Sequence, residues 1–296
     1  ILFNSYFSDL RASIDELSNA SVEFVTAKLS VARMKDILNE PITIDNEKGK
    51  VVFPSEWKKI VFKNVSFAYG NNKVLNDISF EVGRGEKVGI VGLSGAGKST
   101  LFKLLLKERE EFEGSILLDE VPIKQIRKSD YFNQVSVVLQ DTEVFNFSLK
   151  ENITITNAQK KTNLPLLKKA ITTAHISNLV EKLPQGLETI IGEKGVKLSG
   201  GERQRLGIAR AIFKEPEILL LDEATSHLDL ESEEKIRDSL HKFFENVTAI
   251  VIAHRLTTIK EMDKILVIED GKIIESGSFN DLYANKSLVE IDAELR

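Results

Sequence analysis

The sequence predicts an α/β domain with a mostly parallel central sheet, preceded by one long helix. Short apolar runs recur along the chain, with helical stretches between most of them. This alternation is typical of a parallel sheet covered by helices. A glycine-rich turn separates one such run from a helix. The first 40 residues contain neither glycine nor proline, and their apolar residues recur at the helical steps of three and four.

The predicted organisation follows the chain from its N-terminus. Residues 1–41 form a helical extension that stops at Pro41, because the residue before a proline avoids the helical region. Residues 42–59 are more polar, contain the only tryptophan, Trp57, and are expected to form a linker that runs into a strand. The main domain is expected over residues 60–296, which fits the prior of about two domains for this length.

Within the main domain, short β-rich or apolar segments mark the expected strands. They lie at residues 60–68, 74–82, 88–91, 135–139, 218–221, 249–253 and 265–268. A helix is expected over residues 99–106, directly after the glycine-rich turn. The segment from about 141 to 214 is rich in helical patterns and lacks a buried strand, so we expect a helical insert there.

Composition excludes several classes of protein. Lys plus Arg number 40 and Asp plus Glu number 45, so the formal net charge is 40 − 45 = −5, which disfavours a nucleic-acid-binding surface. The sequence contains no cysteine, hence no disulfide or thiolate chemistry, as in a reducing compartment. No run of 18 or more apolar residues occurs, so the sequence predicts no helix that spans a membrane. The first residue is Ile1 rather than Met, so we expect a fragment of a longer protein.

The segment from Gly92 to Ser99 matches a phosphate-binding loop: glycine, four residues, then Gly-Lys-Ser. Its glycines let several backbone N–H groups converge on one anion, and the following helix adds the positive end of its dipole. Lys98 supplies a cation for the outer phosphates, and the Ser99 hydroxyl is a hard oxygen ligand for Mg²⁺. The strand before the loop and the helix after it favour this interpretation over a chance glycine turn.

Two other motifs extend the predicted site. Asp222 and Glu223 follow the apolar run at 218–221, so Asp222 is expected to support Mg²⁺ and Glu223 to polarise the attacking water. Ser199 and Glu202 form a predicted capping box at the start of a helix with Gly200 and Gly201. This second helix start is either a simple cap or a second phosphate contact, made across a head-to-tail dimer.

Taken together, these motifs resemble the nucleotide-binding domain of ATP-binding-cassette (ABC) transporters over about residues 57–282. Gly92–Ser99 matches the Walker A loop, Gln140 the Q-loop, and Leu198–Gln204 the signature. Residues 219–223 match Walker B, residues 226–229 the D-loop with Asp229, and His254 the switch histidine. The resemblance implies a RecA-like P-loop NTPase core, an antiparallel β subdomain and a helical signature subdomain.

The resemblance also implies a role for each matching residue. Tyr69 stacks on adenine, and Glu223 is the catalytic base assisted by Gln140 and His254. Ser99, Gln140 and Asp222 serve Mg²⁺, while Ser199 and Gly201 reach the ATP of the other subunit. The residues expected to bind nucleotide are Tyr69, Gly92, Ser94, Gly95, Gly97, Lys98, Ser99, Thr100, Ser199, Gly201 and Asp229.

The helix before the ATPase domain resembles the cytoplasmic extension of the last transmembrane helix in ABC exporters. Gly192–Gly195 resembles the exporter loop that contacts coupling helices. We therefore expect an ATPase at the cytoplasmic face of a membrane, a transmembrane domain earlier in the same full-length chain, and an identical or related second ATPase domain. A soluble mechanical ABC ATPase acting on nucleic acid or ribosomes is the alternative, and a non-hydrolysing binding module is disfavoured by Glu223 and His254. Lipid, drug, peptide and bacteriocin cargoes all stay open.

Overall fold

The computed structural model describes residues 2–39, 47, 49–222, 243, 247–253, 256–284 and 288. The chain divides into two compact units, Ile1–Lys48 and Gly49–Arg296. The first contains the helix α1 (Leu2–Asn39). The predicted helix is thus present, and its last residue lies two positions before Pro41. No helix in the described ranges is both long and apolar enough to cross a membrane.

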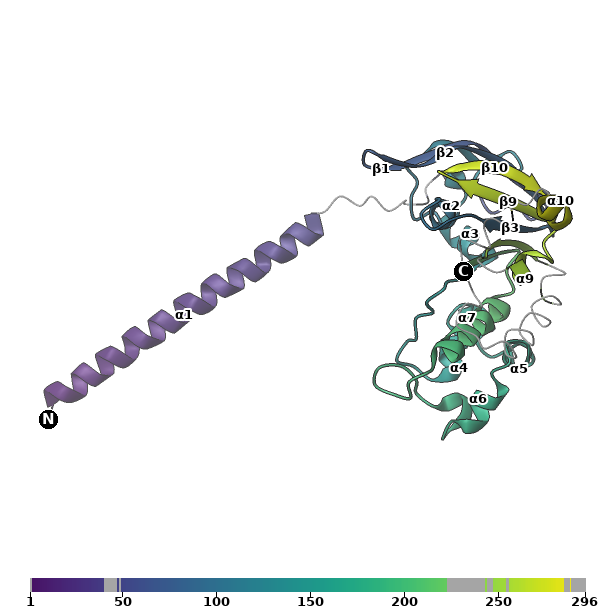
Figure 1. Ribbon diagram of the computed structural model, residues 1–296. Coiled ribbons are helices and arrows are strands. Elements are labelled where there is room, and N and C mark those ends of the chain that lie inside the picture. The colour runs from purple at the N-terminus through teal and green to yellow at the C-terminus, as the bar shows by residue number, and fades with distance from the viewer. Residues whose placement is uncertain are drawn as a thin grey trace. The chain divides into compact units, whose positions relative to one another are not determined.

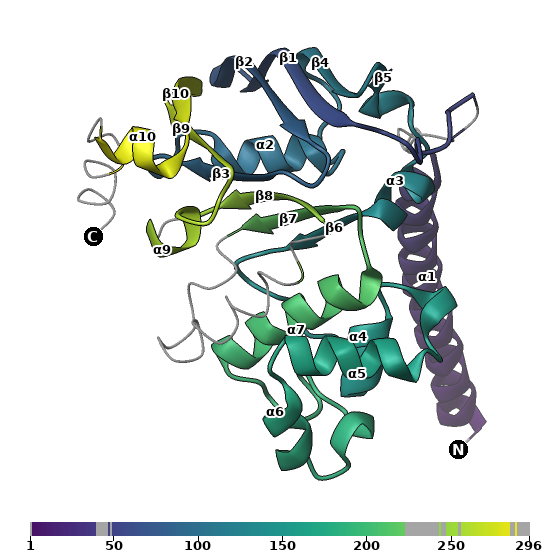
Figure 2. The same cartoon turned by 90° about the vertical axis from the view of Figure 1, so that its right-hand side faces the viewer.

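The centre of the second unit is a six-stranded sheet in the order β10-β9-β3-β8-β7-β6. Figure 1 labels β10, β9 and β3 of this sheet, and Figure 2 labels all six strands. All adjacent pairs from β9 to β6 are parallel, and β10 pairs with β9 in the antiparallel direction. The strand bounds are β3 Lys87–Val91, β6 Val135–Val138, β7 Ile218–Asp222, β8 Thr248–Ile252, β9 Lys264–Glu269 and β10 Lys272–Gly277. The mostly parallel sheet confirms the predicted fold class.

A second, four-stranded sheet is entirely antiparallel and has the order β2-β1-β4-β5. Its strands are β1 Lys59–Tyr69, β2 Asn72–Gly83, β4 Glu113–Leu118 and β5 Val121–Pro122. This is the antiparallel β subdomain that the family resemblance implied. The predicted strands match the observed ones to within two residues, whereas β4, β5 and β10 were not predicted.

The central sheet is buried on both faces, which explains its near-continuous apolar strands. Along β8, Ile250 and Ile252 face one hydrophobic core, and Ala249 and Val251 face the other. The first core is shared with the antiparallel sheet and α2 (Lys98–Leu105), which lies between the two sheets (Figure 2). The second core contains side chains of α7, α9 and α10.

The segment predicted as a helical insert contains helices and no strand of either sheet. Its elements are α4 Leu149–Thr154, η2 Ala158–Lys160, α5 Leu164–Thr173, α6 Ser177–Lys182, η3 Gly186–Glu188 and α7 Gly200–Lys214. Figure 2 shows α4, α5, α6 and α7 grouped together beyond β6 and β7. The remaining described helices are η1 Ile123–Gln125, α3 Lys128–Gln134, α9 Leu256–Ile259 and α10 Phe279–Ala284.

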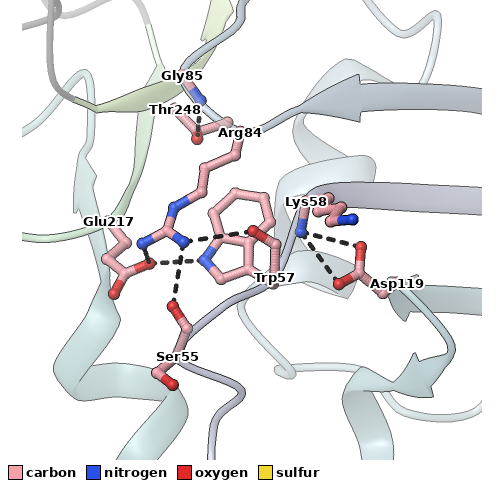
Figure 3. Close-up of polar contacts among 8 residues, drawn as sticks. All are labelled: Ser55, Trp57, Lys58, Arg84, Gly85, Asp119, Glu217 and Thr248. Carbon is pink, nitrogen blue, oxygen red and sulfur yellow. Dashed lines mark hydrogen bonds and ion pairs between the residues drawn. The ribbon is translucent and has the colours of Figure 1, made fainter.

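Part of the segment predicted as a linker packs into the second unit. Trp57 is only 1% exposed, and its indole Nε1 donates to Glu217 Oε2 at 2.6 Å (Figure 3). Arg84 donates to the same carboxylate oxygen at 3.1 Å and to the carbonyl of Ser55 at 3.1 Å. These bonds join the start of β1, the turn before β3 and the residue before β7 at the amino edge of the central sheet.

Candidate nucleotide site

The candidate site lies at the opposite, carboxyl edge of the parallel strands. Because β3, β8, β7 and β6 run in the same direction, the segments that follow them meet there. The glycine-rich loop follows β3, Asp222 ends β7, and Gln140 comes two residues after β6. The register pairs Val138 with Leu221, which places Gln140 and Asp222 at neighbouring strand ends.

The loop from β3 to α2 is built around close backbone approaches. A Cβ atom on Gly92 would lie 2.1 Å from the carbonyl oxygen of Ile268, and φ there is +153°. Gly97 has φ +103°, and a Cβ atom there would lie 2.8 Å from Leu75 Cδ2. Gly97 is also the N-cap of α2 and provides no side-chain cap. Glycine is therefore required at both positions, and the first amides of α2 have no capping side chain from Gly97.

Lys98 is the first residue of α2, directly after this loop, and is only 6% exposed. Its Nζ donates to the carbonyl of Gly92 at 2.7 Å and to the carbonyl of Leu93 at 2.8 Å. The loop itself therefore holds the ammonium group in place. A buried cation at the positive end of a helix dipole strongly favours an anion nearby.

A cavity of about 300 Å³ opens over the loop. It is lined by Val74, Ser94, Gly95, Gly97, Lys98, Ser99 and Thr100. The structure thus brings together most of the residues that the sequence predicted for phosphate. Val74 was not predicted, because nothing in the sequence distinguishes it from other residues at the start of a strand.

Tyr69 ends β1 and is 39% exposed. Its ring makes an edge-to-face contact with Phe67, with ring centroids 4.8 Å apart. Lys103 and Arg109 place their charged groups 5.9 Å from the centre of the Tyr69 ring. Sequence reasoning missed both cations, although Lys103 lies one helical turn after Ser99 and hence on the same side of α2.

The signature segment forms the start of α7. Ser199 is the N-cap: its Oγ accepts from the backbone N–H of Glu202 at 3.3 Å, and its own N–H donates to Glu202 Oε2 at 2.8 Å. The predicted capping box is confirmed. Ser199 and Gly201 do not line the cavity over the phosphate loop. Glu223, Asp229 and His254 lie outside the described residues.

The comparisons with known proteins agree with this geometry. A profile of the family described as "ABC transporter" matches residues 75–226, which is 152 of the 296 residues. The chain belongs to the ABC transporter family. Two bacterial toxin exporters are similar to this ABC domain. The leukotoxin export ATP-binding protein LtxB of Aggregatibacter actinomycetemcomitans is 38% identical over 288 residues, and the toxin RTX-III translocation ATP-binding protein of Actinobacillus pleuropneumoniae is 38% identical over 289.

Each alignment covers 97% of this chain and 40% of the relative, so the chain spans about two fifths of the curated relatives' length. A solved structure of a bacterial Atm1-family ABC exporter with ATP bound is also similar. Its TM-score is 0.83 and its identity 35%, and the match covers 91% of this chain and 47% of that one. The ABC domain is thus an ATP-binding ATPase domain of the exporter type and not a nucleic-acid ATPase.

Proposed function

We propose that two copies of this ATPase domain, identical or related, close head to tail over two Mg–ATP complexes and thereby drive export. One observation supports the dimer above all. The cavity over the phosphate loop includes neither Ser199 nor Gly201, although both belong to the signature motif. In the proposal, the signature of a second chain completes each site.

In the proposal, different residues of one chain bind the adenine, the phosphates and the Mg²⁺ of its own nucleotide. Tyr69 stacks on the adenine, and Gly92, Ser94, Gly95, Gly97, Lys98, Ser99 and Thr100 hold the phosphates. The hydroxyl, amide and carboxylate oxygens of Ser99, Gln140 and Asp222 are the hard donors that Mg²⁺ prefers. When bound, Mg²⁺ neutralises charge on the phosphate oxygens. Glu223 accepts the proton of the attacking water, His254 contacts the γ-phosphate, and Asp229 lies at the dimer interface.

The proposed switch follows from the charge of the γ-phosphate. This group attracts the Lys98 ammonium of one chain and the start of α7 of the other. Closure is favoured while the group is attached, and hydrolysis removes the bridge so that the dimer reopens.

An exposed apolar surface supports the proposed link to a transmembrane domain. This surface includes Phe147 and Ile190. The Gly192–Gly195 loop lies beside it, because Ile191 donates its N–H to the carbonyl of Phe147 at 3.0 Å. Phe147 is 47% exposed and Ile190 is 55% exposed. In the proposal, residues 1–41 continue from the last membrane helix of a longer protein, residues 42–59 connect it to the ATPase domain over 60–296, and that domain works at the cytoplasmic face of the membrane.

The variant Glu223→Gln tests the proposed mechanism. It keeps the shape of the side chain but removes the base, so we expect ATP binding to persist, turnover to fall by roughly 100-fold or more, and a stable ATP-bound dimer to form. Nucleotide titration, ATPase assays with Mg²⁺ and size-exclusion chromatography with ATP measure these three quantities.

Glu120→Gln is the matched control, because Glu120 is an exposed acid in the turn between β4 and β5. It should leave all three measurements unchanged. If the Glu223→Gln chain hydrolyses ATP at the parent rate, the base assignment is wrong. If ATP never promotes dimer formation in either chain, the head-to-tail mechanism is wrong.

A further inference from the structure

The segment between Gln140 and α4 is held by a fully buried amide. Asn152, on α4, is 0% exposed. Its Nδ2 donates to the carbonyls of Phe145 at 2.9 Å and Ser148 at 3.0 Å, and its Oδ1 accepts the N–H of Phe145 at 3.0 Å. A single side chain thus supplies the backbone partners that this irregular segment lacks.

A second side chain fixes the same segment from α7. The Arg210 guanidinium donates from Nε to the Asn152 carbonyl at 2.7 Å and from one terminal nitrogen to Asn152 Oδ1 at 2.7 Å. The other terminal nitrogen donates to the carbonyl of Glu143 at 2.6 Å, and the group lies 5.2 Å from the centre of the Phe145 ring. All three acceptors are neutral, so the rigid fork of the guanidinium rather than its charge matches the site.

Gly207 brings α7 against the beginning of this segment. It lies three residues before Arg210, hence on the same face of α7. A Cβ atom on Gly207 would lie 2.5 Å from Thr142 Oγ1 and 3.3 Å from Val138 Cγ1. Glycine is unfavourable in a helix interior, and the close approach of Thr142 accounts for it here.

We propose that Arg210 is a positioning residue that, with Gly207, binds the segment after Gln140 to α7, so that Gln140 and Ser199 shift as one body. In the proposed function, on which this inference rests, Gln140 serves the chain's own nucleotide and Ser199 serves the partner's. We call these contacts of Arg210 and Gly207 with residues 142–152 the clamp. The clamp therefore connects the two ATP sites of a dimer through each chain. The apolar Phe145 and Phe147 belong to the clamped segment and move with it.

The variant Arg210→Lys tests this proposal, because it keeps the charge and loses the three-donor fork. We expect kcat for ATP to fall roughly 10- to 100-fold, because catalytic groups are misplaced, with KM for ATP within about twofold. Hydrogen exchange followed by mass spectrometry should show faster exchange of the Phe145 amide, whose acceptor Asn152 Oδ1 is also held by Arg210.

Lys214→Gln is the matched control on the same helix. Lys214 Nζ donates to the carbonyl of Val135 at 2.7 Å, at the start of β6 rather than after its end. It should lower Tm without changing kcat or exchange at residues 142–148. Gly207→Ala is the second variant, and it should push Thr142 outward and reproduce the kcat loss even if Arg210→Lys fails to fold.

Unchanged exchange at residues 142–148 in both Arg210→Lys and Gly207→Ala would overturn the clamp. So would a kcat loss in Lys214→Gln equal to that in Arg210→Lys at the same drop in Tm. The exchange measurement needs no turnover. A failure of the proposed function, seen as parental hydrolysis by Glu223→Gln, is therefore distinct from a failure of the clamp.

Discussion

The proposed mechanism assigns a phosphate contact to two helix starts in this chain, and the two starts are capped in different ways. α2 begins at Gly97, which provides no side chain to cap the first amides, and the cavity of about 300 Å³ lies over it. α7 begins at Ser199, which exchanges hydrogen bonds with Glu202 in a complete capping box. The first start is open to an anion, whereas the second already has a carboxylate of its own chain.

In the proposed mechanism, this difference accounts for the start of α2 binding phosphate within one chain and the start of α7 binding it with a partner chain. At α2, the buried Lys98 ammonium and the uncapped amides act together within one chain. At α7, an incoming phosphate has to compete with Glu202 for Ser199. In the capping box of α4, backbone and hydroxyl hydrogen bonds from Ser148 lower the pKa of the Glu151 carboxyl. We infer that α7 binds phosphate only when a second chain presents it.

The largest expected effect comes from breaking the α2 site. Lys98→Ala removes a buried cation held by two loop carbonyls, so ATP affinity should fall by about 3 kcal/mol, roughly 100-fold. Titration with a fluorescent ATP analogue measures it. Lys182→Ala is the control, because this lysine is exposed at the end of α6 and does not line the cavity, so its loss should cost less than about threefold. Binding by Lys98→Ala within threefold of the parent would contradict the assignment.

An intermediate effect is expected from Ser199→Ala, which should separate binding from dimerisation. The loss of the cap costs about 1 kcal/mol of stability. ATP should still bind the phosphate loop with parental affinity, while ATP-promoted dimerisation is lost and turnover falls roughly tenfold or more. Ultracentrifugation with and without ATP gives the dimer fraction.

Ser148→Ala makes the same change in the capping box of α4 and is the matched control. It should cost similar stability and leave dimerisation intact. Equal loss of dimer in the two variants would reduce the role of Ser199 to that of an ordinary helix cap.

The sequence predicted the strand, the glycine turn and the helix of the Gly92–Ser99 segment well, because all of these parts are local. The strand, the glycines, Lys98 and the start of α2 lie within about 20 consecutive residues, and each has a strong pattern. The buried strands were also predicted to within two residues, since both of their faces are apolar. The edge strand β10 was missed because its side chains alternate only between partly buried and exposed, so its apolar signal is weak.

Residues that act through distant contacts could not be predicted. The Trp57 indole bonds to Glu217, 160 positions away, so a local pattern placed Trp57 in a linker although it is buried. In the sequence, Arg210 does not differ from other basic residues on a helix. Only the fold brings the carbonyls of Asn152 and Glu143 to its guanidinium group. Tertiary contacts of this kind set the geometry around the motifs without leaving any local signal.

The smallest expected effect distinguishes the charge of Glu202 from its role as a cap. Glu202→Gln keeps the capping box, which accepts either residue, but removes the negative charge that opposes an incoming phosphate at α7. The ATP concentration for half-maximal dimerisation should fall about two- to fivefold, the equivalent of 0.3–1 kcal/mol for one charge at a helix start. Glu151→Gln changes the same position in the α4 box and should have no effect. Added salt should shrink the difference between Glu202→Gln and the parent, because exposed charges are screened. A higher ATP requirement in Glu202→Gln would mean that the carboxylate assists closure, and that α7, like α2, is ready for phosphate before the partner arrives.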